Sequence, residues 1–111
     1  MVMTRHDPKN ANIDAILTPF FLQQSDIQLV WIYGSVARGE ETEASDLDVA
    51  VAGHQALTPA RRVELAQQIS QLVMREVDLV DLLAERGVIQ SQVLTQGRLL
   101  LKKDTRDRPS A

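Results

Sequence analysis

The chain has 111 residues, enough for one small domain, and 44% of them are hydrophobic. It contains no cysteine, which excludes both a disulfide framework and a metal site built on thiolates. The net charge is −3, and the basic residues form only short, separated groups, so we do not expect direct binding to nucleic acid. No stretch has the character of a membrane span or of a signal peptide, and we therefore expect a cytoplasmic protein.

The first third of the chain predicts one helix followed by a strand. Residues 1–9 are polar, and we expect a flexible N-terminus there. From Asn12 onward, apolar residues recur at the spacing of one helix face, but Pro19 lies inside the pattern and should kink or end the helix near Leu17. The apolar run over residues 27–33 then predicts the first strand.

A second apolar run predicts a strand over residues 46–52. The charged stretch between the two strands predicts only a short helical turn at residues 35–38, followed by a loop. Parallel neighbours need a crossover connection, which usually contains a full helix. Because the connection here is too short for one, we expect the first two strands to be antiparallel neighbours.

The second half of the chain predicts two further helices and two further strands. Thr58 is suited to cap the N-terminus of a helix over residues 59–75, which has a proline at its first position. A strand is expected over residues 76–82, and after it a helix over residues 84–96 that ends at Gly97.

A last strand is expected over residues 98–102, and the charged tail at 104–111 is expected to be disordered. The predicted fold class is therefore α/β: one small domain over residues 10–103, with a mixed sheet of about four strands flanked by helices.

The strongest chemical signal lies between the first two strands. Gly34 and Ser35 follow the first strand, and after ten further residues Asp46 and Asp48 lead into the second. A turn of small residues can offer backbone N–H groups to a phosphate. Two carboxylates on the same face of a strand repel each other, and a bound Mg²⁺ removes that repulsion. Nucleotidyl transfer needs a site that holds phosphate and metal together.

We expect a third carboxylate from the third strand, where Asp78 lies among apolar residues. If the second and third strands are neighbours, Asp46, Asp48 and Asp78 could surround two metal ions. Glu76 shares the face of Asp78, and Asp81 lies on the other face near the end of the strand. The sequence alone leaves all three acids of this strand open as the third ligand.

Each of these features alone has a plain structural explanation, since a Gly-Ser pair is usually only a turn. Together they resemble the signature of the DNA polymerase β-type nucleotidyltransferase superfamily. Residues 33–39 (Tyr-Gly-Ser-Val-Ala-Arg-Gly) and 45–51 (Ser-Asp-Leu-Asp-Val-Ala-Val) are similar to its minimal nucleotidyltransferase (MNT) branch. So are residues 77–82 and 96–100, and the resemblance extends over about residues 10–102.

The resemblance implies a role for each residue of the signature. Gly34 and Ser35 would hold the β- and γ-phosphates of ATP, and the two carboxylates that lead into the second strand would bind two Mg²⁺ ions. Asp78 would complete the metal site and help to deprotonate the attacking hydroxyl. Arg38 is the cation best suited to contact the phosphates, although a solvated loop position explains it equally well.

Members of the MNT branch are commonly antitoxins encoded beside HEPN-domain toxins, which are ribonucleases. The resemblance therefore implies transfer of AMP from ATP to a hydroxyl of a HEPN toxin, typically that of a tyrosine, and a hetero-oligomer with that toxin. Two alternatives stay open at this point. The chain could neutralise its partner by binding alone, without turnover, or it could act on a small hydroxylated molecule.

Overall fold

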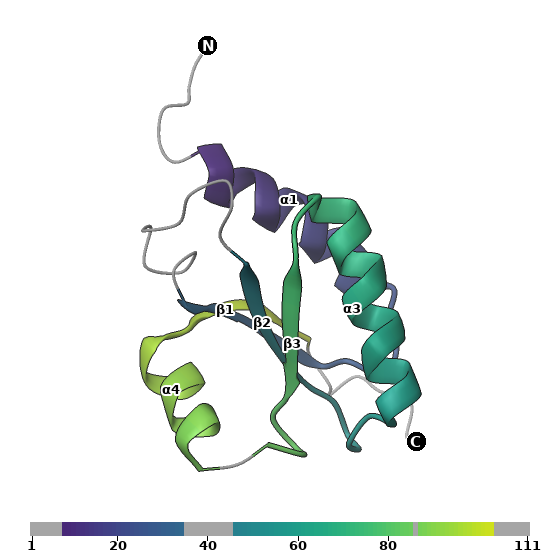
Figure 1. Cartoon of the computed structure of the whole chain (residues 1–111), viewed down its shortest axis with the longest axis vertical. Helices are drawn as coiled ribbons and strands as arrows, with labels where there is room; N and C mark the ends of the chain where they lie inside the picture. The colour runs from purple at the N-terminus through teal and green to yellow at the C-terminus, as the bar shows by residue number, and fades with distance from the viewer. Residues whose placement is uncertain (1–7, 35–45, 86, 104–111) are drawn as a thin grey trace.

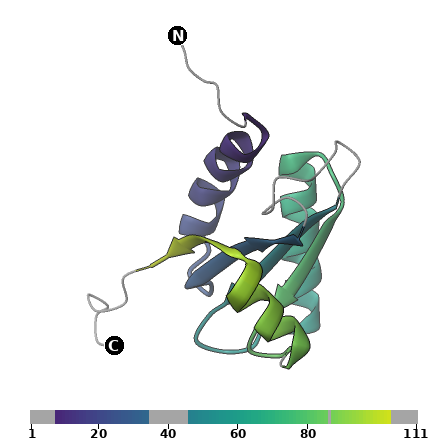
Figure 2. The ribbon, with the colours of Figure 1, turned by 90° about the vertical axis from the view of Figure 1, so that its left-hand side faces the viewer.

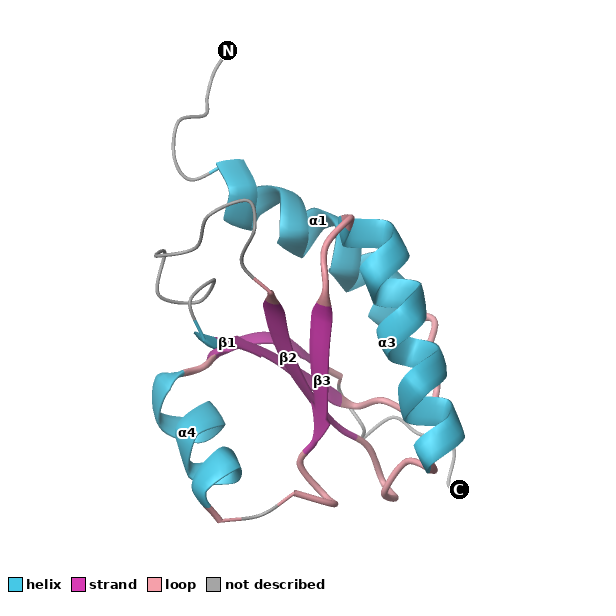
Figure 3. Ribbon diagram, in the orientation of Figure 1, coloured by secondary structure: helices cyan, strands magenta, loops and turns pink. Residues whose placement is uncertain are grey.

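The computed structural model describes residues 8–34, 46–85 and 87–103. Its helices are α1 (Pro8–Leu22), α3 (Pro59–Val73) and α4 (Val88–Gln96) (Figure 1). Its strands are β1 (Leu29–Tyr33), β2 (Leu47–Ala52), β3 (Val77–Asp81) and β4 (Arg98–Lys102) (Figure 3). The predicted α/β class is confirmed.

Three of the sequence predictions concern residues that lie mainly outside these described ranges. The flexible N-terminus, the helical turn at 35–38 and the tail at 104–111 lie outside the described residues, except that Pro8 and Lys9 belong to α1. In the described part of the chain, no helix has both the length and the apolar character that crossing a bilayer requires.

The four strands form one sheet in the order β3-β2-β1-β4. β1 pairs antiparallel with β2 on one side and with β4 on the other. β2 and β3 pair in parallel, and α3 supplies the crossover between them. The sheet is therefore mixed, as predicted, and the antiparallel pairing of the first two strands is confirmed.

Helices cover both faces of the sheet, because side chains alternate between the faces along each strand. α1 and α3 pack on one face, and α4 lies on the other (Figure 2). The α1/α3 face holds the larger core, which contains Ile13, Leu17, Phe21, Ile27, Val30, Ile32, Leu47, Val49, Val51, Leu65, Ile69 and Leu79. On the α4 face, Val93 packs against a smaller cluster of Tyr33, Ala50, Ala52 and Leu82.

The first helix does not end near Leu17, one of the two effects predicted for Pro19, since α1 continues to Leu22. Proline at this position removes the hydrogen bond to the carbonyl of Ala15. Both residues are exposed, so that carbonyl lies on the solvent side of the helix, where water can satisfy it. Leu17 and Phe21 are fully buried on either side of the proline, and their packing holds the last turn in place.

The other helix ends follow the capping residues. Thr58 accepts a hydrogen bond from the N–H of Arg61 at 3.1 Å, which confirms it as the N-cap of α3. Gly97 caps α4 as predicted, and its N–H donates to the carbonyl of Val93. The predicted start of α4 was wrong: the helix begins at Val88 because Gly87 has φ of +81° and separates it from the preceding turn.

Candidate active site

Gly34 brings the end of β1 close to the carboxylate of Asp48 in the predicted site. Its φ is +76°, in the left-handed region that favours glycine. A Cβ at this position would collide with Oδ2 of Asp48 and would lie 3.0 Å from the Cγ of that residue. Only glycine therefore allows this approach. The partners predicted with it in the phosphate-binding segment, Ser35 and Arg38, lie outside the described residues.

The sheet register aligns three side chains across neighbouring strands. Tyr33 at the end of β1 is the Cα partner of Asp48 on β2, and Asp48 is the Cα partner of Asp78 on β3. Directly opposed residues project from the same face of a sheet. The phenol and the two carboxylates therefore form one row on the α4 face, at the end of the sheet where β1 leads into Gly34.

The pKa of the Tyr33 phenol is affected by the negative charge of this row. Its side chain is buried, and desolvation is the largest cause that raises the pKa of the phenol to about 12. The negative charges of Asp78, Asp48 and Glu85 raise this pKa further, in that order. Glu85, in the turn after β3, was not part of the site predicted from the sequence. Its position beside the row depends on how that turn folds back, which residue spacing does not reveal.

Asp46 and Glu76 lie at the outer end of the same face. Asp46 directly precedes β2 and is exposed, as is Glu76 before β3. The N–H of Leu47 donates to the carbonyl of Glu76 at 2.9 Å, which continues the parallel register beyond the strand ends. The two acids are thus next neighbours of Asp48 and Asp78 on one face of the sheet.

The carboxylate of Asp81 has a structural role instead. Its carboxylate is buried on the opposite face, and the residue is only 2% exposed. Oδ2 accepts a hydrogen bond from the N–H of Leu57 at 2.6 Å, and Oδ1 accepts one from the N–H of Leu83 at 3.0 Å. Because one oxygen binds the loop between β2 and α3 and the other binds the turn after β3, Asp81 holds these two segments together. This position separates it from Asp78, the acid that we favoured from the sequence.

The donor set suits a hard divalent cation. Carboxylates side by side on one face repel each other. Their negative charges also raise the pKa of Tyr33 in the same row. Carboxylate oxygens are the ligands that Mg²⁺ prefers in proteins. Within residues 8–34, 46–85 and 87–103, however, no three Asp, Glu, His or Cys side chains form a group that could hold a metal ion. The site of three carboxylates therefore stays a prediction.

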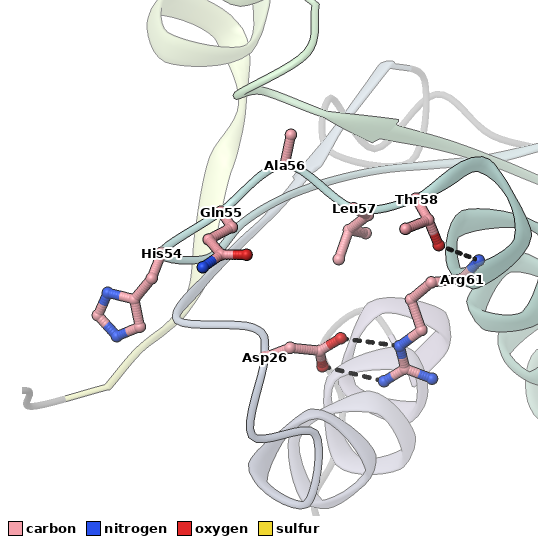
Figure 4. Close-up of a pocket in the computed structure, with 7 residues that line it drawn as sticks. All are labelled: Asp26, His54, Gln55, Ala56, Leu57, Thr58 and Arg61. Carbon is pink, nitrogen blue, oxygen red and sulfur yellow. Dashed lines mark hydrogen bonds and ion pairs between the residues drawn. The ribbon is translucent and has the colours of Figure 1, made fainter.

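A separate pocket lies at the other end of the sheet (Figure 4). It encloses about 270 Å³, and none of the predicted site residues lines it. Arg61 of α3 forms a two-bond ion pair there with Asp26, at 2.8 and 3.0 Å, and also contacts Glu64 and Gln24. The guanidinium holds the pKa of Asp26 below its usual value. His54 is exposed and points away from this ion pair (Figure 4). The pocket thus contains a structural link between α3 and the segment before β1.

Comparisons with known proteins identify the family of the chain. Residues 16–106 match the family described as polymerase beta, nucleotidyltransferase. The protein adenylyltransferase MntA of Shewanella oneidensis is 39% identical over 74 residues, which are 67% of this chain and 53% of that protein. MJ0126 of Methanocaldococcus jannaschii is 33% identical over 54 residues, 49% of this chain and 55% of that protein. The chain thus spans about half the length of the curated relatives it matches.

Solved structures show the same fold. A toxin–antitoxin complex with AMP-PNP matches with a TM-score of 0.71 and 32% identity, covering 86% of this chain and 75% of that chain. A tri-AMPylated HEPN toxin of Shewanella oneidensis in complex with MNT antitoxin matches with a TM-score of 0.68 and 30% identity, covering 86% and 73%. The glycine turn, the paired carboxylates and these matches together show that the chain belongs to the polymerase β-type nucleotidyltransferase family and is similar to the MntA antitoxin and MNT–HEPN structures.

Proposed function

We propose that this protein is an antitoxin that transfers AMP from ATP to a hydroxyl, that of a tyrosine, on a cognate HEPN ribonuclease toxin and thereby neutralises it. The observation that carries the proposal is the alignment of Gly34, Asp48 and Asp78 at one end of the sheet. The similarity to MntA and to an AMPylated HEPN toxin in complex with an MNT antitoxin supports the acceptor. ATP supply and the absence of cysteine agree with a cytoplasmic location.

The chain's own residues divide the work of the reaction. Gly34 and Ser35 bind the β- and γ-phosphates, with Arg38 as the accompanying cation. Asp78 accepts the proton of the attacking hydroxyl. A bond forms between the hydroxyl oxygen and the α-phosphorus, the bond from that phosphorus to the bridging oxygen breaks, and pyrophosphate leaves. Catalysis here depends mainly on positioning and on charge stabilisation.

Asp46, Asp48 and Asp78 are the residues that would hold Mg²⁺. Two bound ions would neutralise the phosphate charge and the repulsion among the carboxylates. Asp46 approaches from the segment before β2, while Asp48 and Asp78 are already paired across the sheet.

The test is the intact mass of the HEPN-domain protein encoded beside this gene, after incubation with this protein, ATP and Mg²⁺. We expect AMP-sized additions that disappear when EDTA is added and when Asp46 and Asp48 are both changed to alanine. Neutralisation without any mass addition and without ATP would contradict the proposal and favour an antitoxin that acts by binding alone. If the toxin is neither modified nor bound, the proposal is contradicted and small hydroxylated molecules are the acceptors to test next.

A further inference from the structure

Three of the predicted site residues lie in a row that ends at the outermost strand of the described sheet. Gly34 follows β1, Asp48 lies on β2 and Asp78 lies on β3. β3 is the outermost strand on this side of the four-stranded sheet that the described residues form. The row therefore runs from Gly34, where we expect the phosphates, to β3 at the outer side of the described sheet.

The direction of the reaction follows from this row, if the proposed function holds. Displacement at phosphorus places the attacking oxygen opposite the leaving oxygen. If the pyrophosphate leaves toward Gly34 on β1, the attacking hydroxyl arrives from the side of β3. The acceptor must then lie along β3, next to Asp78.

The backbone of β3 offers hydrogen-bonding groups along that edge. The carbonyl of Glu76 accepts from Leu47, and the N–H of Leu82 donates to Val51, each at 2.9 Å. In a parallel pair, alternate residues direct both backbone groups at the neighbouring strand. The even-numbered residues from 76 to 82 thus face β2, and the N–H and C=O groups of Val77 and Leu79 face outward.

A groove runs along the α3 side of this edge. It encloses about 270 Å³ between α3 and β3, and its lining includes Val63, Ala66 and Ser70 of α3. Asp78 also lines it, so the groove borders the edge strand that carries the last residue of the carboxylate row. Val63 is 49% exposed, which leaves an apolar contact surface beside the outward-facing backbone groups.

We propose that an extended segment of the protein acceptor pairs with the outer edge of β3 as an additional strand. Side chains of an added strand alternate between the two faces of the sheet. The acceptor residue opposite Asp78 projects onto the α4 face beside the carboxylate row. Its two neighbours project into the groove against Val63 and Ala66. Backbone pairing supplies affinity. The small side chains that line the groove favour small apolar residues on either side of the hydroxyl-bearing residue of the acceptor.

Backbone pairing can be measured on the full chain with the HEPN-domain protein encoded beside it. We expect the amides of Val77 and Leu79 to exchange rapidly with D₂O in the free protein and to become protected in the complex. Protection that appears without the HEPN protein and grows with protein concentration would mean that a second copy of this chain occupies the edge, and would overturn the proposal.

Variants at Val77 provide a functional readout. Val77→Pro removes the outward N–H at the first residue of an edge strand, a position where proline is tolerated. Val77→Ala is the matched control, because it keeps the N–H while it shortens the same side chain. We expect kcat/KM for the HEPN acceptor to be roughly ten-fold lower in Val77→Pro than in Val77→Ala, mainly through KM. Circular dichroism checks that both variants are folded. If Val77→Pro does not fold, the hydrogen-exchange experiment on the unmodified chain decides whether the acceptor pairs with β3.

The outcomes separate this inference from the proposed function. AMP transfer with equal kinetics in both variants and no amide protection would overturn strand pairing and leave the transferase function standing. Amide protection without any AMP transfer would support strand pairing and overturn the transferase function. The absence of both would overturn both.

Discussion

Asp78 and Asp81 lie three positions apart on β3, yet their carboxylates have different environments. Asp78 is exposed on the face that carries Asp48, whereas Asp81 is buried and binds two backbone N–H groups. We expect Asp78→Asn to abolish AMP transfer with little change in the free energy of unfolding. Asp81→Asn places an amide N–H₂ against a backbone donor and should cost about 1–3 kcal/mol of stability. Urea unfolding and the mass assay measure the two effects separately.

These two variants also test the choice of the third carboxylate. If Asp81→Asn abolishes transfer while its unfolding curve matches that of the wild type, then Asp81 rather than Asp78 serves the chemistry. Glu76→Gln is the remaining comparison, since Glu76 shares the face of Asp78. We expect Glu76→Gln to retain most of the activity.

Asp48 occupies the centre of the row, between Tyr33 and Asp78. Asp48→Asn keeps the shape of the side chain and removes the charge that a metal ligand needs. We expect a folded protein with AMP transfer at least 100-fold slower, on the order of the loss seen when one strong electrostatic contact to a reacting group is removed. Transfer at the wild-type rate in this variant would refute the assignment of Asp48.

Tyr33 is the only tyrosine in the chain, so absorbance at alkaline pH follows it alone. In metal-free protein we expect a phenol pKa of about 12, well above the ordinary value of about 10. Because the folded state binds this proton more tightly, the contribution of Tyr33 to stability falls as pH rises from about 10 to about 12. Asp78→Asn should lower the pKa only part of the way, since desolvation is the larger cause. A phenol pKa near 10 in protein with native circular dichroism would contradict this environment.

Among the elements, α3 depends on a single capping hydroxyl at its N-terminus. Thr58 accepts from the N–H of Arg61, while the side chain of Arg61 ties the same turn to Asp26. We expect Thr58→Ala to lower the free energy of unfolding by about 1 kcal/mol and Thr58→Ser to change it little. Chemical denaturation of the three proteins makes the comparison, and equal midpoints for Ala and Thr would show that the Asp26 ion pair alone secures the helix start.

Local signals predicted elements well where the signal and the packing agree. The cap at Thr58 and the C-cap at Gly97 are both readable, because each depends on a few adjacent residues. Pro19 misled the prediction because burial of Leu17 and Phe21 on the sheet outweighs the lost hydrogen bond. The late start of α4 was missed because the positive φ of Gly87 is visible only in the folded backbone.

At the scale of the whole molecule, the candidate site depends on contacts between distant segments. The alternation of residues along a strand predicted that Asp46 and Asp48 share a face, but it could not show which residue lies opposite them. Register supplies that information: it brings Tyr33 and Asp78 beside Asp48 from segments 15 and 30 positions away. The contribution of Glu85 to the charge of the row could not be predicted for the same reason, since it depends on the turn after β3.

Binding of a metal and a nucleotide at the carboxylate row should raise the stability of the whole domain. Any ligand that binds only the folded state stabilises it, by about 2.7 kcal/mol at one hundred times its Kd. For a domain of this size we expect Mg²⁺ with AMP-PNP to raise the Tm by on the order of 10 °C, and AMP-PNP with EDTA to raise it much less. Asp78→Asn removes one of two carboxylates that repel each other, so without ligand it should be no less stable than the wild type, and it should lose most of the Mg²⁺-dependent rise in Tm. Scanning calorimetry of both proteins with and without Mg²⁺ makes the test. An unchanged rise in Asp78→Asn would place the metal elsewhere in the molecule.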